Sequence, residues 1–312
     1  MDVFKINLQR RISNPLIWLI LGCLSICPGA SQAVDNLPIQ PEKLRSADLQ
    51  YQARKLFITA NTRVQLSWQS LPQARENLLG VADLMPLQPD SEKVALTQIE
   101  TSVLGRNTQI DAWMNPNGGI LQISSLRTGR KERYRRYRYL QDQVYSIKRF
   151  PSNNQESQQD WSHWSKIGED YYSLPGDKPS VPLMEPEGLF YLLNILDWSK
   201  VDSQHRLYLF DPDGIVELTL KFLGDSQTEV DYQQKLPDGS AQRIKGKVAT
   251  QEILMSASPW KGTGQAENFD FLGFKGTVRL FVDPQKQVVV LMRGDIDVIG
   301  EVDVRLKNAD FK

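Results

Sequence analysis

The chain has 312 residues, of which 40% are hydrophobic and 24% are charged, so it can form one large domain or two modest ones with a real core. Its 37 basic and 37 acidic residues give a formal net charge of zero, which gives no reason to expect nucleic acid as a partner.

The first 33 residues have the features of a signal peptide. Lys5 and Arg10 lie in a basic start, residues 16–26 are apolar, and Ser31-Gln32-Ala33 fits a signal peptidase site. The apolar run is shorter than the roughly 18 residues that a membrane span requires. We therefore expect an exported, periplasmic protein whose mature part starts at Val34.

Both cysteines, Cys23 and Cys27, lie within this N-terminal segment. Residues 34–312 therefore offer no disulfide, no thiol nucleophile and no cysteine metal site. Cys23 also follows Ile20-Leu21-Gly22, which resembles a bacterial lipoprotein box. Anchoring through an acylated Cys23 is the lesser alternative to cleavage after Ala33.

The mature chain is expected to begin with residues 34–61, an extended segment with a short helix near 49–57. A β domain is predicted over residues 62–312. Its first strands are expected at 62–69, 93–104, 108–114 and 120–127, where apolar runs or alternating patterns occur between turn residues.

The most unusual composition lies at residues 127–150, where arginine and tyrosine are interleaved. As a hairpin, this segment places Arg133, Arg135, Tyr137 and Tyr139 on one face and Tyr134, Arg136, Arg138 and Leu140 on the other. Arginine pairs with phosphate or carboxylate, and aromatic rings hold sugars. Arg136, Arg138, Tyr137 and Tyr139 are therefore candidate ligand-binding residues. The alternative is a solvated hairpin that protects the sheet edge, and in both cases we expect folding to tolerate the loss of Arg136 and Arg138.

Residues 151–182 predict a mobile loop, because the segment is first strongly polar and then rich in proline and glycine. The loop carries an aromatic cluster. Trp161 and Trp164 are further candidate ligand-binding residues, since such a cluster can line a ligand mouth or contact a membrane surface. The alternative is that the cluster packs beneath the loop onto the core.

The clearest helix is predicted at residues 186–198, where proline stands near the first turn and leucines recur at helical spacing. From residue 206 onward the pattern predicts strands, with turns at 211–214 and 237–239. Residues 276–311 contain consecutive hairpins. In the last strand Val302, Val304 and Leu306 are expected to face the core.

The sequence lacks the motifs of common enzyme classes. Neither a nucleophile elbow nor a glycine-rich phosphate loop occurs, and His163 and His205 lack metal-ligand spacing. No catalytic residue, metal or cofactor is therefore predicted. Two carboxylate pairs, Asp295 with Asp297 and Glu301 with Asp303, can each share a strand face. We interpret both as solvated surface, with a catalytic pair as the alternative.

Residues 134–311 resemble a family of exported bacterial proteins that contain a domain of unknown function. The resemblance rests on a basic-aromatic hairpin (residues 134–151), a leucine-rich helix (187–198) and a closing pattern of strands (280–311). It implies a β half-barrel in the cell envelope, similar in shape to lipoprotein carriers, and it implies no catalytic residues.

We therefore expect a mainly β chain: a strongly curved antiparallel sheet, or β half-barrel, with one or two short helices packed on it and an apolar groove. The expected function is non-enzymatic binding of a lipid, a glycan or another envelope component, with peripheral membrane contact. One alternative is a carboxylate-dependent hydrolase of envelope polymers. Another is a structural interaction module with a filled core.

Overall fold

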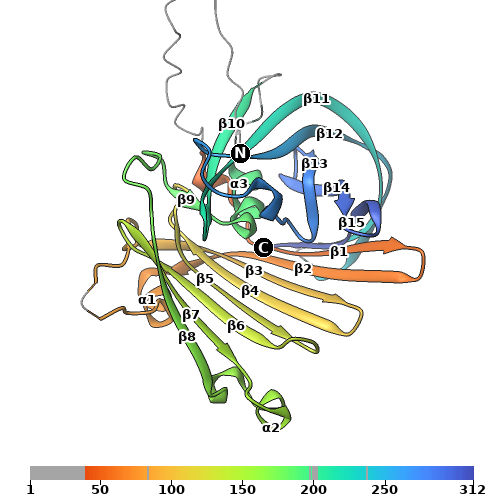
Figure 1. Cartoon of the computed structure of the whole chain (residues 1–312). Coiled ribbons are helices and arrows are strands. Elements are labelled where there is room, and N and C mark those ends of the chain that lie inside the picture. Colours follow the sequence, from red (N-terminus) through yellow and green to blue (C-terminus); the bar gives the residue numbers. More distant parts are fainter. Residues whose placement is uncertain (1–38, 83, 197, 199–202, 237) are drawn as a thin grey trace, which may run out of the picture. The chain divides into compact units, whose positions relative to one another are not determined.

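A computed structural model describes residues 39–312 except 83, 197, 199–202 and 237. The predicted signal peptide, and with it the choice between cleavage and lipidation at Cys23, lies outside the described residues. Within the described part, fifteen strands form a single sheet (Figure 1). The strands are β1 Ala47–Lys55, β2 Ile58–Ser70, β3 Lys93–Val103, β4 Arg106–Met114, β5 Ile120–Thr128, β6 Arg133–Tyr139, β7 Gln143–Phe150, β8 Lys166–Ser173, β9 Leu183–Met184, β10 Gln204–Asp211, β11 Gly214–Lys235, β12 Ala241–Pro259, β13 Phe274–Asp283, β14 Val288–Ile296 and β15 Gly300–Phe311.

The helical segments of the described residues are short. They are η1 Pro41–Lys43, α1 Leu71–Asn77, α2 Asn154–Ser157, η2 Trp161–His163, η3 Pro186–Gly188, α3 Leu189–Ile195 and η4 Ala266–Asn268. None of them has the length and apolar character needed to cross a membrane. The prediction of a mainly β fold with short helices is confirmed.

The strand order is β8-β7-β6-β5-β4-β3-β2-β1-β15-β14-β13-β12-β11-β10-β9. Strands β1–β8 follow one another as an antiparallel meander. The C-terminal strands curl further, because β11 pairs in parallel with β15 as well as antiparallel with β12. Strands β11–β15 therefore close into a ring, whereas β1–β8 remain an open, curved half-barrel (Figure 1).

The prediction of a short helix at 49–57 is wrong, because these residues belong to the hairpin β1–β2. Leu49, Tyr51 and Ala53 are buried, while the residues between them are less so, which is the period of a strand. The hairpin turn places Leu56 at a φ of 53°. Since β1 pairs with β15, residues 47–61 belong to the main sheet, and the described residues form one compact unit.

Helix α3 lies inside the core and confirms the predicted leucine-rich helix, although it ends at Ile195. All seven of its residues are buried. Phe190 packs against Tyr51 of β1 at 5.9 Å and against Phe271 at 5.4 Å between ring centroids. Burial of each large apolar side chain contributes about 1.5–3 kcal/mol. The helix thereby joins the half-barrel to the C-terminal strands.

The segment 151–182 contains more regular structure than the predicted loop. It includes α2, η2 and the edge strand β8, which pairs along its whole length with β7. Trp164 is buried, and its Nε1 donates to the carbonyl oxygen of Glu156 at 2.8 Å. Trp164 thereby ties two parts of this segment together, and Trp161 stacks on Tyr134 of β6 and holds the segment on the sheet.

Strands β1–β8 have two distinct faces. The inner face carries Leu49, Val64 and Ile99 and belongs to the main core together with α3. The outer face is mostly polar. It carries one small separate apolar cluster, which Ala74 of α1 covers. The strand residues of this cluster are Val94, Leu96, Trp113 and Leu121.

Candidate functional site

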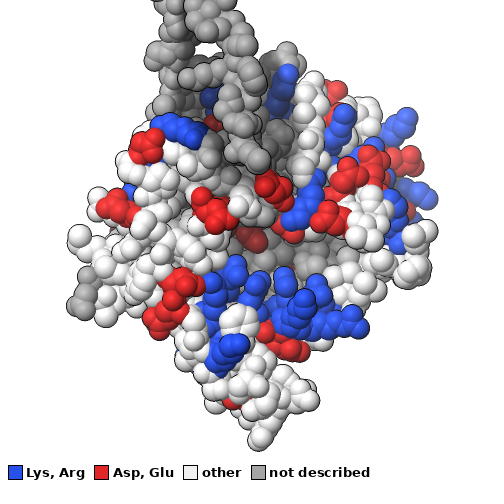
Figure 2. Space-filling view, viewed as in Figure 1, with Lys and Arg blue, Asp and Glu red and all other residues white. Residues whose placement is uncertain are grey.

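A cavity of about 600 Å³ opens on the inner face of strands β3–β6. Glu185 and Glu187, at the start of the η3 segment, and Asp270, before β13, line its other side. A smaller cavity of about 210 Å³ shares these three residues and continues to Phe210 of β10. Figure 2 shows Lys and Arg side chains gathered along one side of a hollow, with Asp and Glu on the other. Cavities of this size suit small molecules.

Four arginines line the larger cavity: Arg106 of β4, Arg127 of β5, and Arg133 and Arg135 of β6. Arg127 lies directly opposite Arg133 in the β5–β6 pairing, a position in which like charges repel. Burial, and after it the charges of Arg135 and Arg127, lowers the pKa of Arg133. The sheet register therefore concentrates positive charge at this point.

These four arginines have no carboxylate partner within ion-pair distance among the described residues. The Nε atoms of Arg106, Arg127 and Arg135 are buried and lack a hydrogen-bond partner there. Buried donors without a partner cost free energy. The guanidinium groups that line the cavity are donors that an anion could accept from.

The carboxyl groups of Glu185 and Glu187 differ from surface glutamates. Glu185 is 8% exposed, and its carboxylate accepts a hydrogen bond from the hydroxyl of Tyr139. Burial raises the pKa of Glu185, and the charge of Glu187 raises it further. Burial also raises the pKa of Glu187, with a contribution from Asp270. Both groups therefore retain protons to a higher pH and weaken the opposing charge in the cavity.

Apolar side chains complete the lining of the larger cavity. Ile99, Val103, Ile110 and Ile123 project from β3–β5, and Leu272 faces them from the segment before β13. The cavity is therefore amphipathic, whereas the sequence led us to expect an apolar groove. The difference arises because inner-face positions at one end of β4–β6 carry arginine, whereas apolar residues occupy positions further along these strands.

Two of the six predicted site residues belong to this cavity or support it. Tyr137 lines it, and its hydroxyl accepts a hydrogen bond from Nη1 of Arg135 at 2.9 Å. Tyr139 lies behind it, almost fully buried, as the donor to Glu185. Both tyrosines project from the inner face of β6, as the alternation of the sequence predicts.

Arg136 and Trp161 lie on the outer face, where they line a separate hollow. Tyr134 stacks on Trp161 with ring centroids 3.6 Å apart, and the guanidinium of Arg136 lies 5.5 Å from the centroid of Tyr134. The six candidate residues therefore do not form one site.

Arg138 and Trp164 are each 2% exposed. Arg138 donates hydrogen bonds to the carbonyl oxygens of Leu79, Leu87 and Leu121 at 3.1, 2.7 and 2.6 Å. Burial lowers the pKa of Arg138 to about 10. The expectation that folding tolerates the loss of Arg138 conflicts with these contacts, because three backbone carbonyls would lose their donor.

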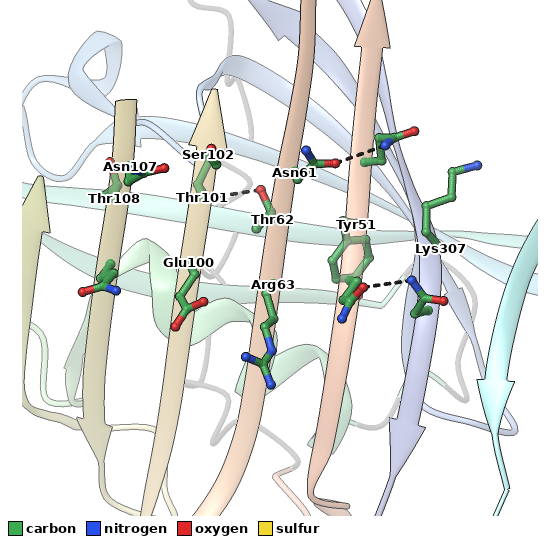
Figure 3. A pocket seen from close by; sticks show the side chains of 14 residues that line it. Tyr51, Asn61, Thr62, Arg63, Glu100, Thr101, Ser102, Asn107, Thr108 and Lys307 are labelled. Atoms are coloured by element: carbon green, nitrogen blue, oxygen red, sulfur yellow. Dashed lines mark hydrogen bonds between the residues drawn. The ribbon is translucent and has the colours of Figure 1, made fainter. Parts of the chain in front are cut away.

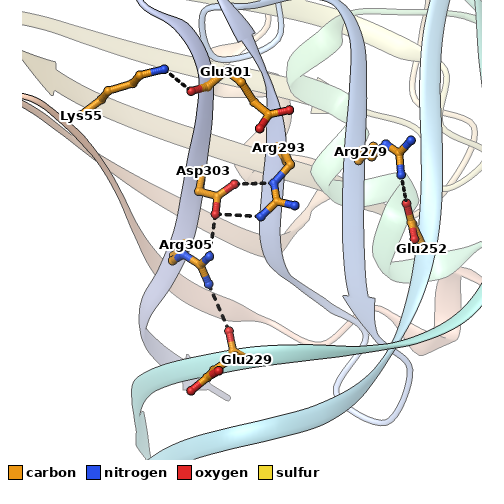
Figure 4. Close-up of polar contacts among 8 residues, drawn as sticks. All are labelled: Lys55, Glu229, Glu252, Arg279, Arg293, Glu301, Asp303 and Arg305. Carbon is orange, nitrogen blue, oxygen red and sulfur yellow. Dashed lines mark hydrogen bonds and ion pairs between the residues drawn. The ribbon is translucent and has the colours of Figure 1, made fainter.

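The carboxylate pairs predicted for the hydrolase alternative lie away from the inner-face cavity. Asp303 pairs with Arg293 at 2.6 Å and with Arg305 at 2.5 Å (Figure 4). Asp297 follows the end of β14, so it does not share a strand face with Asp295. Asp303 belongs to a surface ion-pair network, and Asp295 and Glu301 are exposed. Glu185, Glu187 and Asp270, by contrast, line the cavity.

Among the residues that the structure describes, no group of three or more His, Cys, Asp or Glu side chains is placed to hold a metal ion. The lining of the inner-face cavity offers guanidinium groups and carboxyls. This set of groups favours an organic anion as ligand.

Comparisons with known proteins show little similarity. No protein-family model matches the chain. No curated protein matches it. Among solved structures, the chain is similar to a beta-barrel-like protein of a domain of unknown function, DUF1849, from Brucella abortus, at 10% identity and a TM-score of 0.44. The match covers 86% of this chain and 98% of that one, and these values support no statement about function.

Proposed function

We propose that this chain is a non-enzymatic binding protein that holds an anionic amphipathic molecule in the inner-face cavity. The observation that carries the proposal is the group of four arginines without ion-pair partners beside an apolar wall. The arginines would bind an anionic head group, and the apolar wall would contact a hydrocarbon part. A lipid or a lipid-linked glycan of the cell envelope has this chemistry.

Export is part of the proposal. It rests on residues 1–33, with their basic start, short apolar run and cleavage site. A periplasmic carrier of amphiphiles would meet its ligand at a membrane surface without spanning it. Expression of the full chain in its own envelope, followed by N-terminal sequencing of the mature protein, tests cleavage after Ala33 against acylation at Cys23.

The binding test uses residues 34–312 and two soluble probes below their micelle concentrations, dodecyl phosphate and dodecyl maltoside. We expect titration calorimetry to show tighter binding of the phosphate. The double variant Arg127→Gln/Arg133→Gln should weaken this binding at least tenfold, since each charge-assisted hydrogen bond contributes roughly 1.5–3 kcal/mol.

A matched control removes two exposed lysines of β12, in Lys245→Gln/Lys247→Gln, and should leave the affinity unchanged. Equal binding of the two probes, or equal losses in both double variants, would contradict the proposal. Native mass spectrometry of protein purified from its own envelope then identifies the natural ligand.

A hydrolase remains the second candidate because Glu185 and Glu187 are carboxyls with raised pKa in the same cavity as the arginines. Such an enzyme would release soluble fragments from purified envelope polysaccharide and lose this activity in Glu185→Gln. The proposed binding protein releases none. Tight binding of dodecyl phosphate by Glu185→Gln favours the binding function further.

A further inference from the structure

The register of the sheet aligns side chains from seven strands on the outer face. The successive partners are Asn308 of β15, Gln50 of β1, Arg63 of β2, Glu100 of β3, Gln109 of β4, Leu126 of β5 and Tyr134 of β6. Neighbouring strands lie about 4.8 Å apart, so this row extends roughly 29 Å across the strands.

Two hollows lie along this row and share Gln109. The first, of about 460 Å³, lies over strands β15 and β1–β4 (Figure 3). The second, of about 260 Å³, lies over β2–β6 and ends at Trp161 of η2. Together the outer-face residues that line these two hollows form what we call the outer groove. Such a shape suits an extended chain that crosses the strands.

Amide and hydroxyl side chains dominate the outer groove. Gln52, Asn61, Ser102, Asn107 and Gln109 face the first hollow, and Gln98 faces the second. A carboxamide presents a donor and an acceptor in one plane. A sugar hydroxyl also donates and accepts, so rows of amides can bind successive hydroxyls of a polyhydroxylated chain. Asn61 and Ser102 lie on adjacent strands, as labelled in Figure 3.

The outer groove carries charges of both signs, namely Arg63, Lys307 and Arg136 together with Glu100 and Asp111. Arg63 forms an ion pair with Asp48 at 2.5 Å and lies opposite Glu100 across β2 and β3. Asp111 accepts a hydrogen bond from Gln98 at 2.8 Å and shares the second hollow with Arg136. In this respect Arg63 differs from the four arginines of the inner-face cavity, which lack such a partner among the described residues. An uncharged ligand fits it best.

The aromatic end of the outer groove has two polar atoms without partners. Tyr134 stacks on Trp161, yet its hydroxyl is buried and lacks a hydrogen-bond partner in the described part of the chain. The same holds for the Nε of Arg136. Both residues line the second hollow. Together with Trp161 they form the aromatic end of the outer groove, beside which the last unit of a bound chain would lie.

We infer that the outer groove is a second binding site, which takes an uncharged glycan chain lying across strands β15 and β1–β6. Several sugar units contact the amide rows, and the last lies beside Tyr134 and Trp161. This site lies on the opposite face of the sheet from the inner-face cavity, and its existence does not depend on the proposed function.

The test is titration calorimetry of residues 34–312 with cellohexaose and chitohexaose as neutral probes. At least one neutral hexamer should bind, and cellobiose or chitobiose should bind at least tenfold more weakly than the hexamer of its own series. Asn61→Ala/Gln109→Ala should weaken hexamer binding at least tenfold. Gln109→Trp should abolish it by filling the groove. Both positions are exposed, so these variants keep the fold.

Two control variants separate this site from other surfaces. Lys245→Gln/Lys247→Gln and the inner-cavity variant Arg127→Gln/Arg133→Gln should bind the hexamers as the wild type does. Failure of both neutral hexamers to bind would overturn the inference. So would tighter binding of hexagalacturonate, or hexamer affinities that the groove variants leave unchanged. The groove variants should bind dodecyl phosphate as the wild type does, because they leave the inner-face cavity unchanged. The phosphate titration therefore tests the proposed function independently of the hexamer titrations.

Discussion

Arg138 connects backbone groups from three parts of the chain, because its guanidinium bonds to the carbonyl oxygens of Leu79, Leu87 and Leu121. Arg138→Met keeps an unbranched apolar stem but removes all three donors, and each unsatisfied buried group costs about 1–3 kcal/mol. We expect urea denaturation to show a loss of about 3 kcal/mol or more in the free energy of unfolding. Arg136→Met should lose less than about 1 kcal/mol. Equal losses would contradict this role of Arg138.

The carboxyls of Glu185 and Glu187 predict how stability depends on pH. Their pKa values are raised in the folded protein above the ordinary value of 4.5, so the folded state binds protons more tightly than the unfolded state. The stability that this supplies is complete below pH 4.5 and is lost as pH rises through the raised pKa values. We expect the free energy of unfolding to fall between roughly pH 5 and 9.

The Glu185→Gln variant should show a smaller fall over the same pH range, measured by urea denaturation. Glu100→Gln, on the exposed outer face, serves as the control and should keep the wild-type profile. Asp48 and Asp303 have lowered pKa values because of their arginine partners, so they titrate below this range and do not obscure it. A wild-type stability that rises with pH would refute this interpretation of the cavity.

At the scale of single elements, β15 gives the clearest test of strand orientation. Val302, Val304 and Leu306 are buried, and the residues between them face outward. Val304→Asp places an unpaired carboxylate in the core and should prevent folding, as judged by circular dichroism. Glu301→Gln, at an exposed position of the same strand, should fold normally. A stable Val304→Asp variant would mean that the strand faces the other way.

The elements that sequence predicts well are those whose pattern is local. The hairpins of β13–β15 and helix α3 follow from alternation and from leucine spacing within 10–20 residues. Strand β1 was missed because its alternation is short and contains alanine and glutamine, which also suit a helix. Its partners β2 and β15 decide its structure, and β15 lies about 250 residues away.

The candidate cavity could be predicted only in part, for the same reason. Alternation places Arg133, Arg135 and Tyr137 on one face of β6, and the sequence shows this. The sequence cannot show that Glu185 and Asp270 meet that face, because only the folded core brings these three segments together. The predicted site residues Arg136 and Arg138 lie on the opposite face of the same strand.

At the scale of the whole molecule, one hydrophobic core joins the open half-barrel to the closed ring of β11–β15. The main buried cluster contains Leu49 and Val64 from the first strands, all the apolar residues of α3, and Leu218 and Val304 from the ring. The hydroxyl of Tyr51 also bonds to the carbonyl oxygen of Val289 at 3.0 Å. Neither part can therefore bury its own apolar face without the other.

This shared core predicts a single unfolding transition for residues 34–312. Removal of either part would expose α3 and the strand faces that it covers, and lost burial costs about 25 cal/mol per Å² of apolar surface. Urea titrations followed by circular dichroism and by tryptophan fluorescence should therefore coincide. A fragment of residues 34–173 should fail to give a cooperative transition, whereas residues 34–312 should give one. Two separate transitions, or an independently folded fragment, would show that the half-barrel and the ring are separate domains.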